Sequence, residues 1–181
     1  MKVELKRLTE NELELLMNWR MSDEVNRYMA TSPKLTIEGQ YKWFGKLKND
    51  RTQIRWVIYI DDIPVGSMYL VDIDYSNKRC ESGWFVAEKE YRSLKLAMAL
   101  QQNMFDYIFY TMGLNRNYGY IIDDNKMLLR LMKLCGDEEE GLLRQHVLKD
   151  EIFHDVYVVG ITKDLWIQKR KQFNYEKYYI E

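Results

Sequence analysis

The sequence predicts a mixed sheet flanked by helices, of α+β or α/β class, in a single domain that spans residues 1–181. Segments in which apolar residues recur every three or four positions alternate along the chain with segments in which they recur every second position. These are the periods of an amphipathic helix and of a half-buried strand. The 181 residues are 46% hydrophobic, which suffices for one sizeable core. No linker, repeat or low-complexity tract divides them.

The first third of the chain is predicted to be mostly helical. It opens with an alternating strand over Lys2–Leu8, after which Thr9 and Glu12 have the spacing of a capping box and begin a helix. A short helix over Asp23–Met29 follows, and a third begins at Thr36. We therefore expect a helical layer before the main part of the sheet.

The middle of the chain contains the signals of a hairpin. An apolar strand over Gln53–Ile60 precedes Asp61–Gly66, which holds a proline and a glycine, and the run Ser67–Asp74 follows. Because proline and glycine favour a tight turn, the two runs are expected to pair antiparallel. A further alternating strand is predicted over Arg79–Ala87.

The second half continues the alternation of helices and strands. A helix after this strand places one apolar face along its length and ends at Gly113. The remaining elements are predicted as a strand over Leu114–Ile122, a capped helix over Asp123–Gly136, strands near Leu142–Leu148 and Asp155–Ile161, and a terminal helix within Trp166–Glu181. This order predicts helices on the faces of one sheet.

Charge and composition narrow the possible partners. The 27 Lys and Arg residues nearly balance the 28 Asp and Glu residues, so no global field attracts nucleic acid or an anionic membrane. The segment Met1–Leu16 mixes charged with apolar residues, which argues against a signal peptide or membrane span and predicts a cytoplasmic protein. Cys80 and Cys135 lie in separate apolar segments and are expected to be reduced core residues. With two histidines and no Cys-x-x-Cys pair, no metal site is expected.

The segment "EYRSLKLAMA", Glu90–Ala99, joins a predicted strand to a helix. Free N–H groups and the helix dipole make such a junction suitable for phosphate. Close backbone approach to a diphosphate usually requires glycine, which is absent here. A charged surface loop leading into a core helix is the alternative interpretation.

The whole chain resembles the GNAT superfamily of acetyl-CoA-dependent N-acetyltransferases. "EYRSLKLA" lies where that family has a segment like Y-R-G-K-G-I-G, and it agrees at Tyr91 and Arg92. Ser93 and Lys95 replace glycines, so the loop is a degenerate form of the pyrophosphate loop. Asn125–Gly141 keeps the family's spacing from a capping Asn to a closing Gly and an E-G pair. The resemblance implies a mostly antiparallel central sheet flanked by helices, with acetyl-CoA as cosubstrate.

The resemblance also implies which residues hold the cosubstrate. Backbone N–H groups near the end of the middle strand would bind the pantetheine arm and the thioester oxygen. Lys95 would aim its ammonium group at the diphosphate, with Arg92 beside it. The expected cofactor-binding residues are Phe85, Val86, Arg92, Ser93, Leu94, Lys95, Leu96, Ala97 and Asn125.

Two further segments suggest the acceptor. Leu16–Met29 and Arg79–Val86 look like the amino-sugar-nucleotide acetyltransferases of the pseudaminic acid pathway, and the ribosomal-protein alanine acetyltransferases share a similar W-R element. Aromatic and basic side chains can stack a nucleobase and pair a diphosphate, although Trp and Phe at helical spacing also suit a core. The candidate substrate-binding residues are Trp19, Arg20, Tyr28 and Trp43.

The expected partner is accordingly a small amine, such as a nucleotide sugar, with a homodimer as one possible assembly. N-terminal protein acetylation and a non-catalytic GNAT scaffold are the alternative functions. The first would require an open groove leading to the thioester, and the second would not bind CoA.

Glu81 is the candidate general base, because partial burial on a strand near the cofactor raises the pKa of a carboxyl group. Asp72, Asp74 or a chain of waters are alternatives, and Glu81 could instead be an ordinary strand carboxylate. Many GNAT enzymes have an acidic tyrosine at the position of Met132, and methionine cannot donate a proton. Tyr120 or Tyr118 is the candidate acid; otherwise the thiolate leaves unprotonated or catalysis has been lost.

Overall fold

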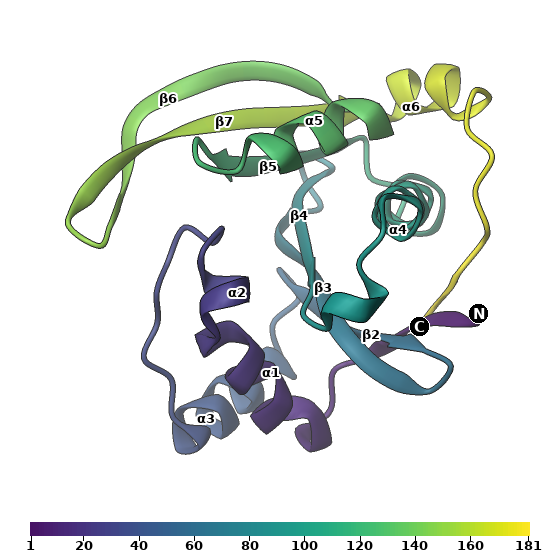
Figure 1. Ribbon diagram of the computed structural model, residues 1–181. Helices are drawn as coiled ribbons and strands as arrows, with labels where there is room; N and C mark the ends of the chain where they lie inside the picture. Colours follow the sequence, from purple (N-terminus) through teal and green to yellow (C-terminus); the bar gives the residue numbers. More distant parts are fainter.

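The computed structural model describes residues 1–181, in which eight strands form one sheet with the order β6-β7-β5-β4-β3-β2-β1-β8 (Figure 1). The strands are β1 (Val3–Arg7), β2 (Ile54–Ile60), β3 (Ile63–Asp74), β4 (Arg79–Val86), β5 (Arg116–Ile122), β6 (Glu138–Lys149), β7 (Ile152–Thr162) and β8 (Tyr179–Ile180). Only the β4–β5 and β1–β8 pairs are parallel. The predicted mixed, mostly antiparallel sheet is confirmed.

Helices cover both faces of this sheet (Figure 1). The helical elements are η1 (Glu10–Glu12), α1 (Leu13–Met21), α2 (Asp23–Asn26), α3 (Ile37–Leu47), η2 (Lys89–Tyr91), α4 (Leu94–Asp106), the π-helical turn η3 (Tyr107–Thr111), α5 (Lys126–Cys135) and α6 (Lys163–Arg170). None of these helices is long and apolar enough to cross a membrane.

Local sequence signals fix several helix ends. The Thr9 hydroxyl and the Glu12 carboxylate form the predicted capping box. The side chains of Ser93 and Asn125 accept hydrogen bonds from backbone N–H groups at the starts of α4 and α5. Gly136 follows α5 with φ +115°, in the left-handed region that favours glycine. These caps satisfy backbone groups that a helix end leaves without partners.

Two apolar clusters pack on opposite faces of the sheet. Trp56, Leu70 and Cys80 contribute to the larger cluster, which includes the buried face of α4. Val57 and Phe85 point the other way and pack in a second cluster with α1 and α3. Because successive strand side chains alternate between faces, these residues define an α4 and α5 face and an α1–α3 face.

The C-terminal region corrects one prediction. The terminal helix expected within Trp166–Glu181 stops at Arg170, and the chain then runs back across the molecule to β1, so that the two termini lie close together (Figure 1). The Asn103 side chain donates to the Glu176 carbonyl at 2.8 Å and accepts from the Tyr178 N–H at 3.0 Å. Aromatic residues of this segment bury against the core, and this long-range packing outweighs local helix propensity.

The predicted strands near Leu142–Leu148 and Asp155–Ile161 form a longer hairpin than expected, from Glu138 to Thr162. Its turn contains Asp150 and Glu151, both with positive φ. The two cysteines are buried and free, as predicted.

Candidate active site

A cleft opens where β4 and β5 diverge. The two strands pair only from Arg79 to Glu81 on β4 and from Arg116 to Tyr118 on β5. Beyond this point β4 pairs with β3 alone, so the edge of Ser82–Val86 that faces β5 has no strand partner. A cleft of about 970 Å³ occupies the space between the strands.

The cleft passes through the sheet and has two sides. Leu94, Ala97 and Gln101 of α4 line it together with Leu128 and Met132 of α5, on one face. We call this the cofactor side. The opposite side, which we call the acceptor side, is lined by residues of the α1–α3 face and of β6: Tyr28, Met29, Tyr69, Glu81, Tyr120 and His146.

The cofactor side presents backbone N–H groups and apolar side chains. The Ser93 hydroxyl accepts a hydrogen bond from the Leu96 N–H at 3.2 Å and caps α4. The Asn125 side chain caps α5 in the same way, because its Oδ1 accepts a hydrogen bond from the Leu128 N–H at 3.1 Å. An exposed helix start beside a free strand edge suits a diphosphate followed by an amide-containing arm.

Most of the predicted cofactor-binding residues lie around this cleft. Phe85, Val86, Arg92, Ser93, Leu94, Ala97 and Asn125 line it. Leu96 is different, because its side chain is 2% exposed and belongs to the core. Its backbone N–H already donates to the Ser93 hydroxyl, so Leu96 contributes the position of the helix start and no side chain to the cleft.

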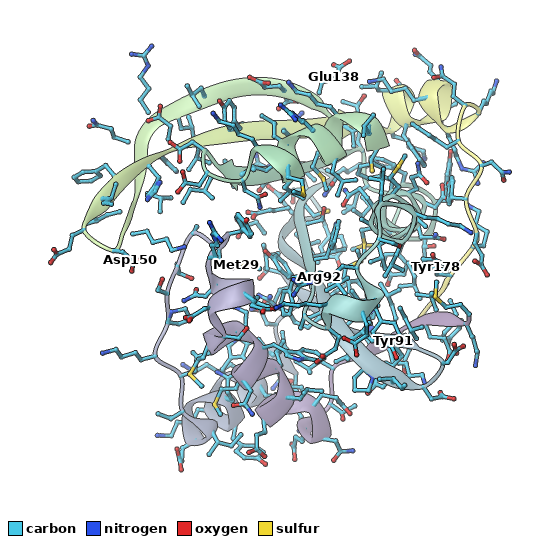
Figure 2. The ribbon with its side chains drawn as sticks, in the orientation of Figure 1. Met29, Tyr91, Arg92, Glu138, Asp150 and Tyr178 are labelled. Atoms are coloured by element: carbon cyan, nitrogen blue, oxygen red, sulfur yellow. The ribbon has the colours of Figure 1, made fainter.

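Arg92 is engaged with the protein itself (Figure 2). Its guanidinium group donates to the Val86 carbonyl at 2.8 Å and to the Ala87 carbonyl at 2.6 Å, and lies 3.5 Å from the Glu24 carboxylate. Lys89 also pairs with Glu24. Arg92 thereby ties the end of β4 to α2 and fixes the loop that leads into α4.

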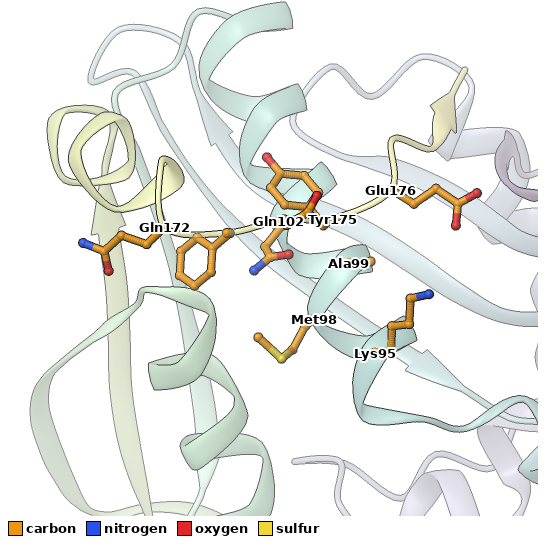
Figure 3. Close-up of a pocket in the computed structure, with 9 residues that line it drawn as sticks. Lys95, Met98, Ala99, Gln102, Gln172, Tyr175 and Glu176 are labelled. Atoms are coloured by element: carbon orange, nitrogen blue, oxygen red, sulfur yellow. The ribbon is translucent and has the colours of Figure 1, made fainter.

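The Lys95 side chain lies outside the cleft (Figure 3). It lines a second pocket of about 580 Å³ between α4 and the C-terminal segment, with Met98, Gln102 and Tyr175 among its neighbours. In the first turn of α4, the Leu96 side chain points to the core and the Lys95 side chain points to this pocket. The expected aim of the Lys95 ammonium group at the diphosphate is not seen.

Glu81 is the central ionisable group of the acceptor side. Burial, followed by the charge of Asp72, raises the pKa of its carboxyl group to about 7, while Arg55 acts in the opposite direction. Glu81 has no ion-pair partner, whereas Glu24, the other carboxylate that lines the cleft, is paired with Lys89 and Arg92. A carboxylate with a pKa near neutrality is suited to accept a proton from an amine.

Tyr118 and Tyr120 are on the acceptor side. Ile121 packs with Met132 on the cofactor side, so the residues before and after it point away from α5. The Tyr120 ring is stacked on His146 at 6.4 Å between ring centroids and is 49% exposed. Neither tyrosine therefore takes the place of the Met132 side chain.

The predicted substrate-binding residues separate into two groups. Tyr28 is exposed and lines the cleft. Trp19 is 7% exposed, and its indole N–H donates to Glu88 at 3.0 Å, so it is a core residue that joins α1 to the loop after β4. Trp43 packs against the same core. Arg20 lies behind the cleft wall and donates to the Thr31 hydroxyl at 3.3 Å.

The sequence reasoning missed Tyr69 and Gly83, which face each other on β3 and β4. A Cβ at Gly83 would lie 2.3 Å from the Tyr69 hydroxyl oxygen, so the absence of a side chain makes room for the ring. Strand alternation places both on the face of Glu81. That alternation was a usable signal, but the cross-strand pairing was not visible in the sequence.

Comparison with known proteins identifies the architecture around this cleft. The family model described as the acetyltransferase (GNAT) domain matches residues 2–137. The chain belongs to this GNAT family. It is 26% identical over 164 residues to an uncharacterized N-acetyltransferase, YoaA of Bacillus subtilis, covering 88% of this chain and 92% of that protein. It is also 26% identical over 133 residues to the acetyltransferase PseH of Campylobacter jejuni, covering 71% and 80%.

Solved structures agree with this assignment of fold. The spermidine N-acetyltransferase of Vibrio cholerae, in complex with CoA and spermine, superimposes with a TM-score of 0.86 at 20% identity over 92% of this chain and 98% of that one. The chain is a GNAT acyltransferase that acts on amines and uses acetyl-CoA. The unpaired edge of β4, the apolar wall and the capped start of α4 fit this cosubstrate.

Proposed function

We propose that this GNAT enzyme acetylates the amine of a small metabolite, an amino-sugar nucleotide, by direct attack of the amine on the thioester. The observation that carries the proposal is the position of Glu81 on the acceptor side of a cleft that crosses the sheet. The resemblance of Leu16–Met29 and Arg79–Val86 to amino-sugar-nucleotide acetyltransferases supports the choice among amine acceptors. The cleft of about 970 Å³ is shared by its two sides, so acetyl-CoA and the acceptor meet in one continuous space.

Each part of the site has a physical role in this proposal. Acetyl-CoA supplies the reactive thioester when bound. The free N–H groups of Ser82–Val86 hold the pantetheine arm and stabilise the negative charge that develops on the thioester oxygen. The start of α4 faces the diphosphate with the backbone N–H groups of Leu94 and Lys95, because those of Leu96 and Ala97 already donate to Ser93. Glu81 takes the proton of the acceptor amine, directly or through one water.

The leaving thiolate has no side-chain acid beside it on the cofactor side, because Met132 occupies that position. Our candidate acid is Tyr120, which lies on the acceptor side and would protonate the thiolate across the gap between β4 and β5. The low pKa of a thiol relative to an alcohol also permits departure as the thiolate.

The test is a thiol-release assay with acetyl-CoA and a panel of acceptors: UDP-linked amino sugars, spermidine, and a peptide with a free N-terminus. We expect the highest kcat/KM with an amino-sugar nucleotide. A higher kcat/KM for the peptide or for spermidine would overturn the acceptor assignment. Isothermal calorimetry with acetyl-CoA, run in parallel, separates a wrong acceptor from a protein preparation that does not bind the cosubstrate.

A further inference from the structure

Two arginines lie together behind the acceptor side of the cleft. Arg20 comes from α1 and Arg55 from β2, and both are half-buried. The Arg55 guanidinium group lies 4.5 Å from the ring centroid of Tyr69 and 5.7 Å from that of Trp43. Tyr69 lines the cleft and neither arginine does, so the Tyr69 ring lies between the Arg55 guanidinium group and the cleft.

Neither arginine has a carboxylate partner. Four other arginines do have one: Arg116 pairs with Glu140, Arg170 with Asp106, Arg79 with Asp74 and Arg92 with Glu24. Arg20 and Arg55 donate instead to the neutral oxygens of Thr31 and Gln53, each at 3.3 Å. Neither positive charge is therefore neutralised by an ion-pair contact, although the Glu81 carboxyl group acts electrostatically on Arg55 without touching it.

Part of their hydrogen-bonding capacity is also unused. Nη1 of Arg20 and Nε of Arg55 are buried and have no hydrogen-bond acceptor. Burial lowers the pKa of both guanidinium groups, and the charge of Arg20 lowers the pKa of Arg55 further. Buried donors without partners are rare in folded proteins, and two like charges placed side by side add to their cost.

We infer that Arg20 and Arg55 form an oxyanion site for the acceptor, so that the enzyme selects an amine that also carries a phosphate or carboxylate. This rests on the proposed function, because it takes the side of Glu81 as the acceptor side. Guanidinium groups match the geometry of both oxyanions. Glu81 contacts the amine of the acceptor and the arginine pair contacts its oxyanion. The two contacts together set the orientation of the acceptor in the cleft. A polyamine has no group for the arginine pair and is repelled by it.

The test measures anion binding apart from turnover. The protein is first saturated with CoA, which fills the diphosphate site of the cosubstrate, and is then titrated by calorimetry with UDP, inorganic pyrophosphate and glutamate. The same titrations are made with Arg20→Gln and Arg55→Gln. Arg144→Gln is the matched control, because Arg144 is exposed on β6 and its side chain makes no hydrogen bond or ion pair. The three ligands distinguish a nucleoside diphosphate, a free phosphate and a carboxylate as the source of the oxyanion.

We expect at least one anion to bind the CoA-saturated protein, and its affinity to fall about tenfold or more in each arginine variant, as for loss of a charge-assisted hydrogen bond. Arg144→Gln should bind as the wild type does, and Arg55→Lys should retain part of the affinity. Retained CoA binding in each variant shows that it has folded.

Two results would overturn the inference: no saturable anion binding at 10 mM, about ten times the weakest useful dissociation constant, or equal anion affinity in the wild type and both glutamine variants. Failure of the proposed function has a different signature. An anion that binds through Arg20 and Arg55 while no amino-sugar nucleotide is acetylated would leave the oxyanion site in place and remove that acceptor. If both glutamine variants acetylate an amino-sugar nucleotide at wild-type rates, the acceptor assignment stands and the oxyanion site is removed.

Discussion

The cofactor side and the acceptor side of the cleft are built from different chemical groups. On the cofactor side the polar groups are backbone N–H groups at the free edge of β4 and at the capped start of α4, and the side chains around them are mainly apolar. On the acceptor side the polar groups are side chains: Glu81, Tyr69 and the arginines behind them.

This difference explains how the loop before α4 can depart from the family's glycine-rich form. A site made by backbone groups depends on where the strand and helix lie, and less on which side chains they carry. A site made by side chains changes its ligand when one residue changes. We therefore expect substitutions on the acceptor side to change catalysis strongly, and those on the cofactor side to change binding moderately.

The largest effect is expected for Glu81→Gln. Loss of the general base should lower kcat by about 100-fold to 10,000-fold, while the dissociation constant of acetyl-CoA stays close to that of the wild type. Steady-state kinetics and calorimetry measure the two quantities. Glu90→Gln, at an exposed carboxylate in η2, is the control. A kcat within threefold of the wild type would exclude Glu81 as the base.

Gly83→Ala should come next. The added Cβ would meet the Tyr69 hydroxyl at 2.3 Å, so the ring must move away from the position it holds beside Glu81 and Arg55. A shift of this kind at a reacting centre costs up to about 100-fold in rate, and we expect kcat/KM for the acceptor to fall by about 10-fold to 100-fold.

Gly45→Ala is its matched control, because no atom lies within 4 Å of the Cβ position there. Tyr69→Ala removes all three close contacts of the added Cβ, which are the hydroxyl oxygen at 2.3 Å and the ring carbons Cζ and Cε2 at 2.4 and 2.8 Å. If the loss comes from these contacts, Gly83→Ala should lower kcat/KM no further in a Tyr69→Ala background, and an unimpaired Gly83→Ala enzyme would contradict it.

The pH dependence should sharpen the assignment of the base. Because burial raises the pKa of Glu81 to about 7, kcat/KM should rise about tenfold per pH unit below neutrality, with a midpoint near 7, and level off above it. Glu81→Gln should remove this limb. Glu81 should also make the free energy of unfolding depend on pH. Between the usual carboxyl pKa of about 4.3 and a pH of about 7, the unfolded chain has lost the Glu81 proton while the folded protein still holds it, so the folded state becomes less stable as pH rises. Thermal denaturation across this range measures that term.

The smallest effects are expected on the cofactor side. Ser93→Ala removes the cap of α4 and should cost about 0.5–2 kcal/mol in the free energy of unfolding, with a several-fold weaker affinity for acetyl-CoA. Lys95→Ala should change that affinity by less than about threefold, in line with an exposed charge, because the side chain lies in the second pocket. Thermal denaturation and calorimetry compare the two. A larger loss for Lys95→Ala would show that its side chain turns toward the diphosphate when the cosubstrate binds.

The sequence by itself determined the local structure. The capping box at Thr9, the cap at Asn125, the glycine at 136 and the alternation along β4 were all readable, because each depends on residues within a few positions of one another. The same signals, with the resemblance, were sufficient for the fold and for the position of the loop that leads into α4.

Only the tertiary structure decided the composition of the site. The divergence of β4 from β5, the contact of Tyr69 with Gly83 and the meeting of Arg20 with Arg55 join residues that are far apart in the chain. The direction of the Lys95 side chain and the path of the C-terminal segment were also decided there. Such contacts follow from strand register and long-range burial, in which a side chain's neighbours are set by the whole sheet and not by the residues beside it in sequence.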